Sequence, residues 1–147
     1  MSITFIRELQ VNYSTTNKEI TTQLLEPELV AQFLRSVLPT NVQECVLAVY
    51  LSSCLKPLAY KVVSIGTNDA CMFEPSDIIR PALLCGATKL IVAHNHPSGN
   101  IQPSAADKKV TTRLKEACSL LGLTLLDHII IADNSDFYSF NTSGLLI

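Results

Sequence analysis

The sequence predicts a single-domain α/β protein in which a mixed β-sheet is flanked by helices. Two observations support this fold class. Apolar runs of strand length alternate along the chain with one-sided helical patterns, and no linker or repeat divides them. With 147 residues, 48% of them apolar, the chain can bury one core. We expect a strand and loop extension over residues 1–28 and the domain itself over residues 29–147.

The elements of the first half follow from local patterns. Residues 3–13 interleave β-branched and aromatic residues with charges, which is typical of an edge strand. Pro27 opens a helix whose apolar residues keep one-sided spacing until Pro39 ends it. The nearly continuous apolar run of residues 44–51 predicts a strand covered on both faces, and residues 59–65 predict its hairpin partner.

The second half is predicted to contain five further elements. They are a helix over residues 77–85, the strand that ends in His94 and His96, a helix over residues 103–121, and strands over residues 123–132 and 137–140. Pro81 should kink the first of these helices because it lacks a backbone N–H, and Gly86 should close it. The order is strand, helix, strand, strand, helix, strand, helix, strand, strand.

The strand exit at His94 and His96 has the composition of a metal site. Alternate residues of a strand share a face, so both imidazoles point the same way. A turn follows, and the helix from Pro103 places Asp107 within or beside its buried stripe, where a carboxylate needs a partner or a cation. Two imidazoles and one carboxylate with an open fourth position form the ligand set of catalytic zinc. We therefore predict that His94, His96 and Asp107 bind zinc.

Simpler interpretations compete with this one. The two histidines could be ordinary hydrogen-bonded side chains. Ser104 and Asp107 could form a capping box, with Ser104 as the N-cap, and taken alone this pair favours capping. The His-x-His spacing at the preceding strand exit tips the balance towards a metal.

Two further polar positions allow two interpretations each. Glu44, the one charge in its strand, either projects inward or frays into solvent, and the strand pattern alone favours fraying. Asp127 and His128 interrupt a buried strand and are most often a satisfied core pair in that setting. They are also candidates to support the ligating histidines from behind.

Composition limits the protein class. Five scattered cysteines with no Cys-x-x-Cys pair indicate neither a disulfide framework nor a thiolate zinc site, and a reducing cytosol is the simplest location. Early charges and the lack of an apolar run of ~20 residues predict a cytoplasmic protein without signal peptide or membrane span. The net charge of −2 gives no signal for nucleic-acid binding, and nothing in the sequence indicates an oligomeric state.

The motif resembles a known family. His94-x-His96-Pro97 and Ser104-x-x-Asp107, with seven residues between His96 and Ser104, resemble the JAMM metalloprotease motif of the MPN/JAB fold. The likeness is to the RadC family in particular, and specifically to short RadC-like proteins without the helix-hairpin-helix module. It runs from about Leu29 to the C-terminus and rests on four stretches: His94-Asn95-His96-Pro97-Ser98-Gly99-Asn100, Pro103-Ser104-x-x-Asp107, Leu126-Asp127-His128-Ile129-Ile130 and Tyr138-Ser139-Phe140.

The resemblance implies a cytidine-deaminase-like arrangement of layers and a JAMM-type zinc hydrolase, a metallopeptidase that cleaves a peptide or isopeptide bond of a peptide or protein substrate. It implies that His94, His96 and Asp107 bind Zn²⁺, that Glu44 is the general base, and that Ser104 assists at the oxyanion. The alternatives are an interaction module with a non-catalytic metal site and a DNA-repair-associated protein. The presence of all five residues argues against a vestigial site.

Overall fold

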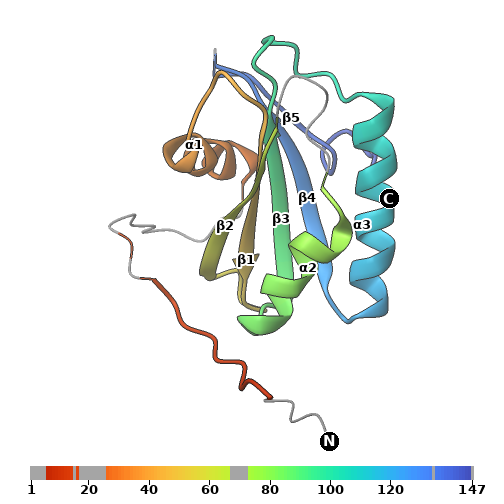
Figure 1. The fold of residues 1–147 in the computed structure, drawn as a ribbon. Coiled ribbons are helices and arrows are strands. Elements are labelled where there is room, and N and C mark those ends of the chain that lie inside the picture. The colour runs from red at the N-terminus through yellow and green to blue at the C-terminus, as the bar shows by residue number, and fades with distance from the viewer. Residues whose placement is uncertain (1–5, 15, 17–25, 67–72, 134, 147) are drawn as a thin grey trace, which may run out of the picture.

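The protein, represented by a computed structural model, is an α/β fold with one mixed sheet (Figure 1). The structure describes residues 6–14, 16, 26–66, 73–133 and 135–146. Within them the elements are α1 (Pro27–Val37), β1 (Cys45–Leu51), β2 (Pro57–Ile65), α2 (Pro75–Leu84), β3 (Lys89–Asn95), α3 (Ala105–Leu120), β4 (Thr124–Ile131) and β5 (Phe137–Ser139). The strand order is β2-β1-β3-β4-β5. Because β3 and β4 are parallel and the other pairs antiparallel, the sheet is mixed, and the predicted fold class is confirmed.

Helices cover both faces of this sheet, α1 on one face and α2 with α3 on the other (Figure 1). Alternate residues of β1 and β3 therefore enter two separate cores. One core joins Val46, Ala48, Leu90 and Val92 to Val110 and Leu114 of α3, and the other joins Leu47, Val49, Ile91 and Ala93 to Val30 and Leu34 of α1. All seven residues of β1 are buried, as the continuous apolar run predicts for a strand covered on both faces.

The pairing of β1 with β3 fixes the position of the polar motif. These strands are antiparallel, with Val46 opposite His94. The start of β1 therefore lies beside the end of β3, and Glu44, which directly precedes β1, lies at the same edge of the sheet as the histidines.

The predicted N-terminal edge strand is wrong over the residues that can be compared. Residues 6–13 form no strand, and Ile6 and Leu9 are 96% and 78% exposed. Residues 3–5 lie outside the described residues. A strand-like pattern forms a strand only beside a hydrogen-bonding neighbour, and this segment lies apart from the sheet (Figure 1).

Two helices begin at residues other than those predicted. The second helix begins at Pro75 rather than residue 77, because Glu74 and Asp77 form a capping box, and it continues past Pro81 to Leu84. The third begins at Ala105 rather than Pro103, because Ser104 has an extended backbone and acts as the N-cap. Among the described residues, no helix combines the length and apolar character needed to cross a bilayer.

Candidate metal centre

Three side chains from β3, the following loop and α3 converge at one end of the sheet. His94 lies in the last part of β3, His96 follows the strand, and Asp107 is in the first turn of α3. The Nε2 atoms of the two histidines are 2.9 Å apart. Asp107 Oδ1 is 3.3 Å from His94 Nε2, and Oδ2 is 3.6 Å from His96 Nε2. The ligand atoms of the three residues all lie within 4.8 Å of one another, so this group could hold a metal ion.

The capping box and the metal group coexist. Ser104 Oγ accepts a hydrogen bond from the Asp107 N–H at 3.0 Å, and the Ser104 N–H donates to Asp107 Oδ2 at 2.8 Å. These bonds fix the carboxylate and leave Oδ1 facing His94. The two interpretations of the Ser104 and Asp107 pair are therefore not alternatives, because capping orients the same carboxylate that faces the imidazoles.

The chemistry of the donor set fits a divalent cation. His96 Nδ1 lies 2.5 Å from the backbone oxygen of Asn100, which can only accept a hydrogen bond, so Nδ1 carries the ring hydrogen. His96 Nε2 therefore has a lone pair that can bind a metal ion. Nε2 then faces a second imidazole nitrogen and a carboxylate, an arrangement that needs a proton or a cation between the lone pairs. These residue types suit zinc.

The pKa shifts of His96 and Asp107 both reflect the hydrogen bonds between the imidazoles and the carboxylate. The hydrogen bond with Asp107 raises the pKa of His96, although burial opposes this. Burial alone would raise the pKa of Asp107, but the hydrogen bonds from His94 and His96 outweigh it and hold that pKa far below its usual range. The centre therefore attracts positive charge, whether a proton or a metal ion.

Glu44 is held at the edge of this group. Its backbone oxygen accepts a hydrogen bond from the Gly66 N–H at 2.7 Å. The Asp107 hydrogen bond raises the pKa of His96 most, burial opposes it, and the Asn100 carbonyl and the charges of Asp107 and Glu44 add smaller upward contributions. Glu44 is partly buried, so free fraying into solvent does not describe its position.

Ser104 is exposed at the start of α3, one turn from the carboxylate of Asp107. Its oxygen accepts the Asp107 N–H, which leaves the hydroxyl hydrogen free to point towards a bound molecule.

Asp127 and His128 have different surroundings because neighbours in a strand face opposite sides of the sheet. His128 Nε2 is 2.8 Å from His94 Nδ1, and its ring stacks on Phe140. Burial and the neighbouring His94 lower the pKa of His128 well below its usual value. Of the two candidates, His128 is the one with a contact to a member of the metal group.

Asp127 instead holds the C-terminal turn. Its carboxylate accepts hydrogen bonds from Ser139 Oγ at 2.6 Å, from the Asn141 N–H at 2.9 Å and from the His128 N–H at 2.8 Å. Burial raises the pKa of Asp127 despite these bonds.

Two residues near the centre were missed from the sequence. Asn95, at the end of β3, bonds the backbone beside Glu44, and Thr111 of α3 bonds His128. The signals available in the sequence were an asparagine between two histidines and a hydroxyl one helical turn after Asp107.

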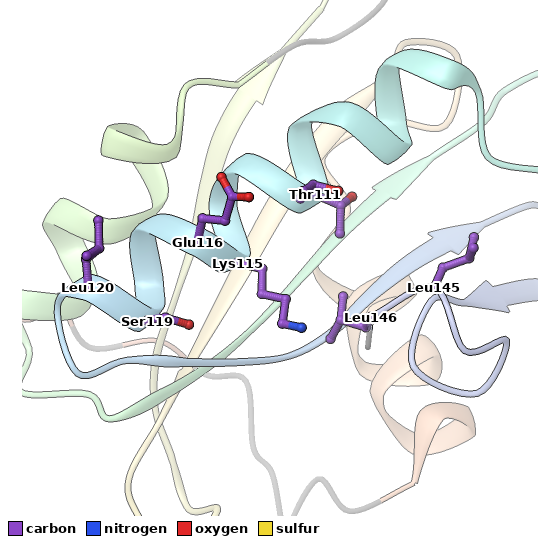
Figure 2. Close-up of a pocket in the computed structure, with 8 residues that line it drawn as sticks. Thr111, Lys115, Glu116, Ser119, Leu120, Leu145 and Leu146 are labelled. Atoms are coloured by element: carbon purple, nitrogen blue, oxygen red, sulfur yellow. The ribbon is translucent and has the colours of Figure 1, made fainter.

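A groove of about 540 Å³ runs along α3 beside the C-terminal residues (Figure 2). Figure 2 shows Lys115, Glu116 and Ser119 of α3 on one side and Leu145 and Leu146 on the other. His94, His96 and Asp107 do not line this groove, but Thr111 does, and Thr111 contacts His128 behind the metal group.

Known proteins resemble this chain over most of its length. The model of the RadC-like JAB domain matches residues 12–145, so the likeness begins before Leu29, the start that the motifs indicate. A UPF0758 protein of Streptococcus sanguinis (strain SK36) is 39% identical over 118 residues, which are 80% of this chain and 52% of the relative. A UPF0758 protein of Streptococcus suis (strain 98HAH33) is 45% identical over 105 residues, which are 71% of this chain and 42% of the relative.

A third relative, the UPF0758 protein CT0611 of Chlorobaculum tepidum, is 38% identical over 117 residues, 80% of this chain and 52% of the relative. The chain thus spans about half the length of the curated relatives it matches. The names of these relatives state no activity. Since the family model covers all the elements described above, the chain belongs to the RadC-like JAB domain family.

Proposed function

We propose that the chain is a zinc-dependent hydrolase of the JAMM type, a metallopeptidase that cleaves a peptide or isopeptide bond of a protein or peptide. The observation that supports this most directly is the convergence of His94, His96 and Asp107 with Glu44 at the same edge of the sheet. Membership of the JAB family supports the same reaction class.

His94, His96 and Asp107 would hold the zinc ion, which would supply Lewis acidity to polarise a carbonyl and make a water acidic near pH ~7. Glu44 would take the proton of that water and pass it to the leaving amine, first as general base and then as general acid. Ser104 would donate its hydroxyl hydrogen to the carbonyl oxygen as negative charge develops there. A donor of this kind commonly contributes ~3 kcal/mol to the transition state.

The cysteines fit a cytoplasmic location, which we propose as well. In the described part of the chain, Cys85 and Cys118 are free thiols. Free thiols persist in a reducing compartment.

A comparison of three proteins tests the reaction. Wild-type protein, Glu44→Gln and Glu116→Gln, whose glutamate is exposed on α3, are loaded with zinc and incubated with a proteome-derived peptide library and with isopeptide-linked peptides. Mass spectrometry then detects new termini. We expect cleavage by the wild type and by Glu116→Gln, and no cleavage by Glu44→Gln, with equal zinc content in all three.

Two results would contradict the proposal. Cleavage by Glu44→Gln would exclude Glu44 as the base. Zinc-loaded wild type that cleaves neither class of bond would favour an interaction module with a non-catalytic metal site.

A further inference from the structure

We propose that Thr111 is a positioning residue for the metal centre, and that it sets, through His128, which ring nitrogen of His94 carries the proton. The proposal rests on the metal-binding part of the proposed function and not on hydrolysis.

The three residues form one chain of contacts behind the metal group. Thr111 Oγ1 is 2.6 Å from the backbone oxygen of Asp107 and 2.6 Å from His128 Nδ1. His128 Nε2 is 2.8 Å from His94 Nδ1, and His94 Nε2 faces His96 and Asp107. Thr111, His128 and His94 are 2%, 1% and 3% exposed. Protons in this chain are therefore placed by protein partners rather than by bulk water.

The hydrogen-bonded series from Thr111 through His128 to His94 allows two proton arrangements with the same total number of protons. In the first, the Thr111 hydroxyl donates to Asp107 O, the His128 Nδ1–H donates to Thr111 Oγ1, and the His94 Nδ1–H donates to His128 Nε2. His94 Nε2 is then a free lone pair directed at the metal group, as a ligand must be.

In the second arrangement every proton points the other way. The Thr111 hydroxyl donates to His128 Nδ1, and the His128 Nε2–H donates to His94 Nδ1. The remaining ring proton of His94 then sits on Nε2, where it blocks a metal ion. This arrangement also loses the hydrogen bond from Thr111 to Asp107 O, because a hydroxyl has one hydrogen to donate.

Thr111 thus favours the metal-competent arrangement by offering an acceptor to the His128 Nδ1–H. In Thr111→Val a methyl group replaces the hydroxyl at nearly constant shape. A buried N–H without an acceptor is rarer in proteins than an under-satisfied acceptor, so His128 should move its proton to Nε2 in this variant. Thr111→Ser keeps the hydroxyl and should keep the wild-type arrangement.

The neighbouring Thr112 offers a matched control. Its hydroxyl donates to the Lys108 backbone oxygen at 3.1 Å, the same bond to the preceding helical turn that Thr111 makes, but at an exposed position. Thr112→Val therefore removes the same group from the same helix without changing the partners of His128.

Long-range ¹H–¹⁵N spectra of the imidazole rings report the protonated nitrogen directly, and the protein has three histidines to assign. We expect His128 to be protonated at Nδ1 in zinc-free and zinc-loaded wild type, Thr111→Ser and Thr112→Val, and at Nε2 in zinc-free Thr111→Val. In competition with a chelator, we expect Thr111→Val to bind zinc about tenfold more weakly and both other variants to bind it as the wild type does.

Protonation of His128 at Nε2 in the zinc-loaded wild type would overturn the proposal, and this measurement needs no variant. Wild-type ring spectra and zinc affinity in Thr111→Val would overturn it as well. If neither the wild type nor any variant bound zinc, the metal site itself would be refuted. The zinc-free spectra would still show which ring nitrogens of His128 and His94 carry protons.

Discussion

The side-chain amide of Asn95 bonds the backbone on both sides of Glu44. Its Oδ1 accepts from the Cys45 N–H at 2.7 Å, and its Nδ2 donates to the Gln43 oxygen at 3.0 Å. Asn95 itself lies between His94 and His96 in the sequence. One side chain therefore connects the residues that could hold a metal ion to the segment that carries the proposed base.

Removal of this connection should destabilise the protein. In Asn95→Ala the Cys45 N–H loses its acceptor at a residue that is 0% exposed, which should cost about 1–3 kcal/mol in the free energy of unfolding measured with urea. Asn100→Ala is the control, because the Asn100 side chain accepts the Gln102 N–H in an exposed loop, and we expect a loss below about 0.5 kcal/mol. Equal losses in the two variants would show that the Asn95 bonds contribute little.

A pair of capping aspartates separates capping from metal binding. Asp107 and Asp77 each accept the N-cap N–H in a capping box, but Asp107 alone of the two faces imidazoles. Asp107→Ala should lose zinc after dialysis against a metal buffer, whereas Asp77→Ala should keep about one equivalent, because its change removes a cap alone. Elemental analysis measures the zinc. Full zinc content in Asp107→Ala would refute the ligand assignment.

Zinc affinity should depend on pH through His96. The hydrogen bond to Asp107 raises the pKa of His96 above its ordinary value against the effect of burial, so the zinc-free centre holds a proton at acidic pH. Zinc must displace that proton below this pKa and has none to displace at His96 above it. Affinity measured with a competing chelator should therefore fall about tenfold per pH unit on the acidic side and level off on the alkaline side. A constant affinity from acidic to neutral pH would contradict the proton competition.

Two roles of Ser104 can be measured apart. Ser104→Ala removes the side chain that accepts the Asp107 N–H and should cost about 1 kcal/mol in the free energy of unfolding. If the hydroxyl also serves the reaction, kcat should fall by about 10²–10³ in the same variant. Ser104→Thr keeps the hydroxyl and should retain most of both. A Ser104→Ala enzyme with the kcat of the wild type would exclude a catalytic role for Ser104.

The approach of His94, His96 and Asp107 to one another could be predicted from the sequence because it depends on short-range geometry. His94 lies in β3, His96 directly follows that strand, and a short loop connects them to the helix that carries Asp107. The two-residue period and the short connection leave these three side chains little freedom. The buried strands β1, β3 and β4 were predicted to within a few residues for a similar reason, because apolar runs covered on both faces are hard to place elsewhere.

The parts that were missed depend on contacts between distant residues. Asn95 reaches a residue 50 positions away, and only the antiparallel pairing of β1 and β3 brings the two together. From the pattern of its own strand, Glu44 looked free to fray. Residues 6–13 have strand-like alternation but no adjacent strand, so local pattern alone gave the wrong structure there.

The carboxylate of Asp107 divides its oxygens between two tasks, since Oδ2 closes the first turn of α3 and Oδ1 turns towards His94. An ion bound by this side chain would also stabilise the start of α3. By thermodynamic linkage, a stable first turn of α3 would increase the affinity for the ion. Amide hydrogen exchange in that first turn would then become a gauge of occupancy, slow when the ion is present and faster once a chelator has taken it away.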